Sequence, residues 1–190
     1  MPTGTLRLLA IPLWTLLACS HPTEPSSCGD ARSLDPALRL PPATTLTIDD
    51  QWAALARQVP GGWGGFLLDS AGRPTVYLVH PDRRQEALAA LYADGVGLPL
   101  YDIRTSQVWQ GRWDFAQLYD WYRYINVRAW TVAGLYWTDI DEARNRLAYG
   151  VDTTAKADFE SLLATLDLPC DLVTVVVSTV GTPLRALRKE

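Results

Sequence analysis

The sequence predicts an α+β fold built from two copies of one α-β-β-α-β unit, with helices packed on antiparallel or mixed sheet. Two observations predict it. Helix-like and strand-like periodicities follow one another in the same order twice, and matching residues recur at a near-constant separation. Gly65 and Gly134 are 69 residues apart, and the aspartates that follow them are 70 apart. We expect the copies to span residues 43–108 and 109–190, within one globular domain or two.

Each copy begins with a helix whose apolar residues recur at intervals of three, four and seven. Thr47 with Asp50, and Asp114 with Gln117, have the spacing of a capping box at the two helix starts. A hairpin, a second helix and a returning strand follow in each copy. Their expected ranges are 66–68, 75–79, 82–92 and 100–105 in the first copy, and 130–137, 146–151, 154–166 and 172–178 in the second.

The first eighteen residues have the layout of a secretory signal peptide. Residues 8–18 are almost entirely apolar and follow Arg7, and eleven residues are too few to span a bilayer, which needs about 20. Export is therefore expected. The apolar run ends in Leu16, Leu17, Ala18 and Cys19.

This ending resembles the lipobox of bacterial lipoproteins, in which a small residue precedes the cysteine that receives the lipid. The resemblance implies cleavage before Cys19, a lipid such as palmitate on that cysteine, and attachment to a membrane of the cell envelope. Ser20 in the next position resembles the pattern for the outer membrane, if the organism has one. The alternative is an ordinary signal peptide cut nearby, which also exports the chain.

Residues 19–42 are rich in proline and serine, which predicts a tether without regular structure or a core. The net charge is −4, and it becomes about −5 once Arg7 is removed with residues 1–18. A mildly acidic chain has no electrostatic footprint for nucleic acid. If Cys19 carries lipid, Cys28 and Cys170 remain and favour a disulfide in an oxidising compartment; the alternative is two free thiols.

Motifs for catalysis and cofactor binding are missing from the sequence, so we expect no cofactor and no enzyme activity. His80 follows a strand and is explained as a turn residue. Asp139, Asp141 and Glu142 are close enough in sequence to share a hard cation, and they are weak candidates for a metal site. Their place in a hairpin turn is equally explained by turn chemistry. A hydrolase that uses only carboxylates stays open.

Aromatic residues gather between positions 109 and 137, which hold ten of the nineteen in the chain. The helix in this region has one buried stripe and a second aromatic stripe on the opposite face. The second stripe consists of Trp113, Gln117, Trp121, Tyr124 and Arg128. Such a face is either packed, for example between the two copies, or a binding surface. We expect it to be packed.

A short segment of the second copy resembles the repeated unit in the pro-regions of secreted bacterial serine proteases of the alpha-lytic and streptogrisin type. The matching residues, spread over about 45 positions, are Asn145, Arg146, Leu147, Gly150, Val151, Asp152, Pro169, Asp171 and Val173. The resemblance implies a small module that assists the folding of a protease or inhibits it. The expected function is therefore a membrane-anchored, noncatalytic interaction module for an unknown envelope or extracellular protein, with a protease-directed module and a carboxylate hydrolase as alternatives.

Overall fold

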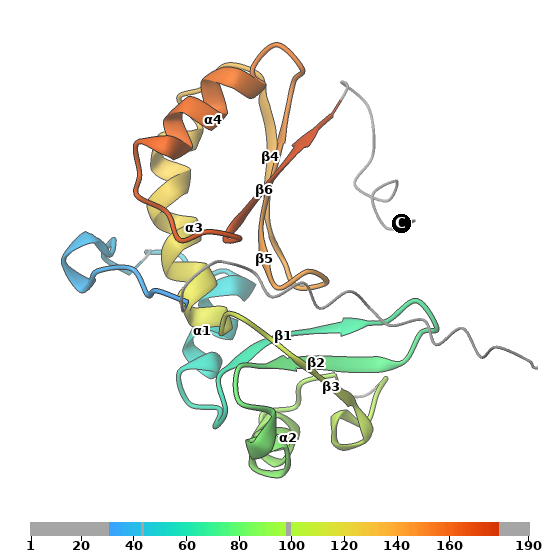
Figure 1. Cartoon of the computed structure of the whole chain (residues 1–190). Helices are drawn as coiled ribbons and strands as arrows, with labels where there is room; N and C mark the ends of the chain where they lie inside the picture. Colours follow the sequence, from blue (N-terminus) through green and yellow to red (C-terminus); the bar gives the residue numbers. More distant parts are fainter. Residues whose placement is uncertain (1–30, 43, 98–99, 179–190) are drawn as a thin grey trace, which may run out of the picture.

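The computed structural model describes residues 31–42, 44–97 and 100–178. Within these ranges the order α-β-β-α-β occurs twice, which confirms the expected α+β fold (Figure 1). The predicted signal peptide, Cys19 and Cys28 lie outside the described residues.

The two copies share one topology. The first comprises α1 (Ile48–Ala56), β1 (Trp63–Leu68), β2 (Pro74–Leu78), α2 (Arg84–Ala93) and β3 (Gln107–Gln110). The second comprises α3 (Phe115–Ala129), β4 (Leu135–Asp141), β5 (Arg146–Val151), α4 (Lys156–Ala164) and β6 (Val173–Val177). In each copy the first two strands are antiparallel and the third runs parallel to the second, so the returning strand lies at a sheet edge.

Two strands lie further along the chain than expected. Residues 103–105 form a 3-10 turn, because the Asp102 carboxylate caps it by accepting the Arg104 amide at 3.1 Å. The third strand of the first copy therefore lies at 107–110, and the expected boundary between copies falls inside it. In the second copy β4 begins only at Leu135 and continues to Asp141.

By strand pairing, the hairpins of the two copies correspond with a shift of 72 residues in the first strand and 73 in the second, instead of 69 or 70. Gly62 and Gly134 both have positive φ, +69° and +91°, immediately before β1 and β4. Their carbonyls accept equivalent bonds, from the Val79 amide at 2.9 Å and the Asp152 amide at 2.8 Å. A register shift follows at the start of each first strand, so the bulge is duplicated with the fold.

Both predicted capping boxes are confirmed. The Thr47 hydroxyl accepts the Asp50 amide at 3.2 Å, and the Asp50 carboxylate accepts the Thr47 amide at 2.8 Å. Asp114 and Gln117 make the same reciprocal pair at the start of α3, at 2.7 and 3.2 Å. These bonds satisfy amides that a helix start otherwise leaves unpaired.

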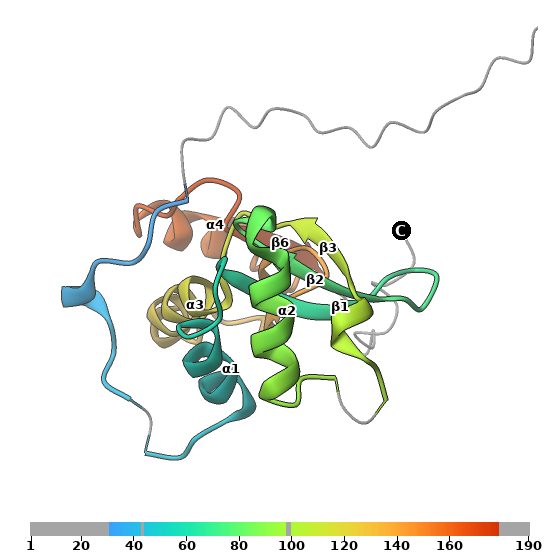
Figure 2. The same cartoon turned by 90° about the horizontal axis from the view of Figure 1, so that it is seen from below.

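Helix α3 packs along α1, lies beside the second sheet and contacts β1 of the first sheet (Figures 1 and 2). Its first turn places Phe115 against Trp63 of β1 and Trp52 of α1, with ring centroids 6.0 and 5.5 Å apart. Trp63, Phe115 and Ile125 are fully buried. Aromatic packing therefore joins the first sheet to a helix of the second copy.

The turn between β4 and β5 rests on the first sheet, and Asn145 is its buried contact. The Asn145 side-chain oxygen accepts the backbone amides of Arg112 and Trp113 at 2.8 and 2.9 Å. Its side-chain nitrogen donates to the carbonyls of Trp113 and Gly64 at 2.8 and 3.2 Å. A Cβ at Gly64 would lie 2.4 Å from the Trp113 carbonyl oxygen, so this contact requires glycine. The two copies thus form one body around Asn145.

We expect Asn145→Ala to lower the free energy of unfolding by at least about 3 kcal/mol. The change leaves several buried amides and carbonyls without partners, and each such loss costs about 1 to 3 kcal/mol. Urea denaturation measures the effect. Asn126→Ala is the matched control and should cost less than about 1 kcal/mol, because the Asn126 side chain donates only a 3.4 Å bond to Thr138. Equal losses for the two variants would contradict the role of Asn145.

Candidate functional site

The second aromatic stripe is mostly buried. Trp113 and Trp121 are 0% and 3% exposed, while Tyr124 and Arg128 are half-buried. Trp113 precedes α3 and belongs to the junction at Asn145, because its backbone amide and carbonyl both bond to the Asn145 side chain. Arg128 lies over the Tyr124 ring, with the guanidinium carbon 4.1 Å from the centroid. The stripe is therefore packed, and sequence reasoning missed what covers part of it.

Residues 31–42, which we call the N-terminal segment, lie beside α3 (Figures 1 and 2). The Trp121 indole donates to the Arg32 carbonyl at 2.9 Å, and the Gln117 amide donates to the Ser33 hydroxyl at 2.8 Å. Leu34 is only 1% exposed and belongs to the core. This half of the expected tether is therefore a docked part of the fold. Burial of Leu34, together with hydrogen bonds and ion pairs along the segment, offsets the entropy cost of ordering it.

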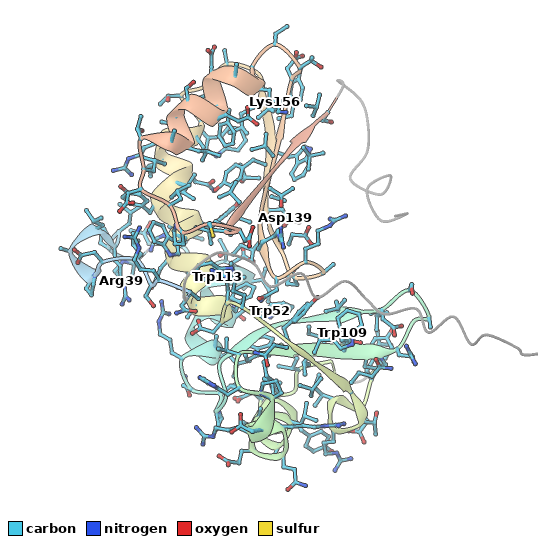
Figure 3. All side chains as sticks on the ribbon, viewed as in Figure 1. Arg39, Trp52, Trp109, Trp113, Asp139 and Lys156 are labelled. Carbon is cyan, nitrogen blue, oxygen red and sulfur yellow. The ribbon has the colours of Figure 1, made fainter. Side chains whose placement is uncertain are left out.

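The far end of the segment is held by charged side chains of α3. Asp120 pairs with Arg39 of the segment at 3.1 Å and with Arg57 after α1 at 3.0 Å (Arg39 in Figure 3). Arg123 donates to the carbonyls of Leu40 and Pro41. Between these contacts, residues 36–38 form a 3-10 turn capped by Asp35. We call the residues that hold the segment, Gln117, Asp120, Trp121 and Arg123, the α3 docking face.

Near its start the segment also contacts the loop that follows α4. Arg32 forms an ion pair at 3.0 Å with Asp167, three residues before Cys170. Cys170 is not a free thiol. Cys28 lies outside the described residues, so its pairing with Cys170 stays a prediction. The Arg32–Asp167 contact brings the two cysteines' flanking segments together, as that pairing requires.

The three acidic candidates do not converge. Asp139 is exposed in β4, on the far side of the second sheet from α3 (Figure 3). Asp141 pairs with Arg144 at 2.8 Å and caps the turn, and Glu142 begins that turn. Within the described ranges no group of three or more His, Cys, Asp and Glu side chains could hold a metal ion. Turn chemistry therefore accounts for Asp141.

Glu142 is the one candidate with an unusual environment. Its side chain lies against Gly65, where an added Cβ would be 2.9 Å from the Glu142 Cγ. The pKa of Glu142 is raised to about 7, chiefly by burial and also by the negative charges of Asp139, Asp49 and Asp141. A carboxyl group with this pKa could transfer protons near neutrality.

Glu142 does not line either of the two surface hollows described here. One, of about 360 Å³, lies between α1, β1 and the loop after α2 and includes Trp52, Phe66 and Asp94. The other, of about 460 Å³, is bordered by Arg84, Gln85, Leu88, Ala89 and Arg104. His80 is exposed before a 3-10 turn, at the predicted strand-to-helix junction.

No family model matches the chain, and no curated protein matches it. Among the described residues, no helix is both long and apolar enough to cross a membrane.

We expect Trp121→Ala to cost about 3 to 5 kcal/mol of unfolding free energy, because it removes a large buried ring and the bond to the segment. Trp130→Ala is the matched control: Trp130 ends the same helix but is 56% exposed, and it should cost less than about 1 kcal/mol. An unaltered urea midpoint for Trp121→Ala would show that its packing contributes nothing.

Glu142 should make stability depend on pH. Its folded pKa of about 7 exceeds the ordinary 4.5, so the folded state binds the proton more tightly. The free energy of unfolding should therefore fall as pH rises from about 4.5 to 7. We expect Glu142→Gln to be about 1 to 3 kcal/mol more stable than the wild type at pH 8, with no such gain at pH 4. Glu160→Gln, at an exposed position in α4, should show no such pH dependence. A gain for Glu142→Gln that is equal at both pH values would contradict the raised pKa.

Proposed function

We propose that this chain is an exported lipoprotein whose folded part is a binding module held close to a membrane. The apolar run that ends in Leu16-Leu17-Ala18-Cys19 carries the proposal, because export signal, small residue and cysteine coincide. Lipid on Cys19 attaches the module to the envelope, where its partner is an envelope or extracellular protein.

The docked N-terminal segment sets how far the module can move from its anchor. Eleven residues, and so twelve residue-to-residue steps, lie between Cys19 and Ala31, where the described chain begins. A fully extended chain of this length reaches at most about 40 Å. A free tether over residues 19–42 would reach about 80 Å. Docking therefore halves the greatest distance between the module and its lipid anchor.

Strand β6 favours a binding role. Every residue from Val173 to Val177 is at least partly exposed, and the strand carries no charge. The Leu172 carbonyl and the Ser178 amide bond to β5, so the backbone groups of Val173, Val175 and Val177 point away from the sheet. An uncharged edge of this kind can add a strand from a partner.

A protease-directed module is the second candidate, and it rests on the resemblance of residues 145–173 to protease pro-regions. These residues form β5, α4 and the start of β6, so the matched positions include the same exposed edge. Assays of secreted serine proteases with the soluble mature chain separate the two candidates. Inhibition or assisted refolding would select the protease-directed module.

The anchor is tested by Cys19→Ala in the full-length chain. We expect the variant to leave the membrane fraction after a carbonate wash and to lose metabolic palmitate labelling, while its folded part is unchanged. Cys28→Ala is the control and should keep both membrane attachment and label. Recovery of Cys19→Ala in the washed membranes would overturn the lipoprotein assignment.

A further inference from the structure

The contacts between the N-terminal segment and the α3 docking face are those of peptide recognition. Two α3 side chains, Trp121 and Arg123, donate to backbone carbonyls of the segment. Leu34 is its buried anchor, and Leu38 remains 47% exposed. Charged pairs then fix both ends, with Arg32 on Asp167 and Arg39 on Asp120. The face therefore fits a peptide with a leucine anchor between two arginines and a 3-10 turn after the leucine.

The link between this segment and the rest of the chain makes few contacts. The described residues from Pro42 to Ile48 are all exposed, and Leu46 and Ile48 are 69% and 60% exposed. Among the described residues of this stretch, the side-chain hydrogen bonds are those of Thr47 with Asp50, which belong to the start of α1. Leaving the docking face therefore breaks the contacts of residues 31–41 and, where Cys28 is bonded to Cys170, that disulfide.

We propose that the α3 docking face is a peptide-binding site and that the N-terminal segment of a second copy occupies it by exchange. A second copy presents the identical leucine and arginines, so every contact seen within one chain forms equally between two. The link over residues 42–47 can extend by roughly 20 Å, which allows the segment to reach a neighbour. Exchange needs no new interface, since it reuses contacts already present.

The first test uses the mature chain with Leu34→Ala, which weakens its own segment, and a fluorescent peptide of residues 31–42. The buffer is reducing, so that a Cys28–Cys170 bond cannot hold the segment in place. We expect saturable binding to this variant and at least tenfold weaker binding to the wild type, whose own segment competes. A peptide with Leu34→Ala should bind at least tenfold more weakly, while a peptide with Leu38→Ala should bind as the original does.

The second test detects exchange between whole chains. Leu34→Ala has an intact docking face and a poor segment, whereas Trp121→Ala has an intact segment and a poor face. Mixed together, they should form a heterodimer in native mass spectrometry that neither forms alone. Peptide binding without a mixed dimer would overturn exchange between copies.

The melting temperature of Leu34→Ala gives a further test of the peptide-binding site. If Leu34→Ala is partly unfolded, the peptide should raise its melting temperature and leave that of the wild type unchanged. A folded variant that does not bind the peptide, a variant that the peptide fails to stabilise, or equal binding of the original and Leu34→Ala peptides would overturn the peptide site.

Discussion

The buried amide of Asn145 fixes how the two copies meet, and much of the structure depends on it. A side-chain amide offers two donor hydrogens and two acceptor lone pairs, and all four are used here by backbone groups 32 to 81 residues away in the sequence. The residue adopts φ +52°, which asparagine tolerates better than most residues. The hydrogen bonds of Asn145 hold the β4–β5 turn against the first sheet. There the Tyr77 hydroxyl donates to the Ala143 carbonyl, and Glu142 lies against Gly65. The raised pKa of Glu142 is thus a consequence of the junction, since the same close approach removes that carboxyl group from water.

Helix α3 makes the two copies unequal. It has 15 residues and α1 has nine, and residues 117–123 in its first half carry the α3 docking face. The N-terminal segment uses this face. The same helix therefore forms the shared core through Phe115 and Ile125 and connects, through Trp121 and Asp120, to the segment that leads back to the proposed lipid anchor. Any partner that binds at β6 would act on a body whose distance from the membrane is limited by this helix.

Features carried by local patterns could be predicted from the sequence. Periodicity identified the helices, the capping boxes marked two helix starts, and the duplication was clear from the order of elements. Strand limits were less predictable, because they depend on bulges and on glycines of positive φ such as Gly62 and Gly134. Leu34 was missed because the proline- and serine-rich composition around it predicts a tether and neither a helix nor a strand. The role of Asn145 was missed because its partners are distant in sequence, and the pKa of Glu142 depends on a glycine 77 residues earlier.

Native-state hydrogen exchange at the Arg112 and Trp113 amides tests the junction most directly. Both amides donate to the Asn145 side chain and lie between β3 and α3, where a simple linker between independent domains would otherwise exchange quickly. If Asn145 joins the copies into one cooperative unit, these two amides should exchange with the same free energy as the β2 and β5 amides, and all four groups should lose protection together in denaturant. The opposite result is a free energy of exchange at Arg112 and Trp113 that is several kcal/mol lower than in the two sheets. It would show that the copies are independent units and would contradict this account.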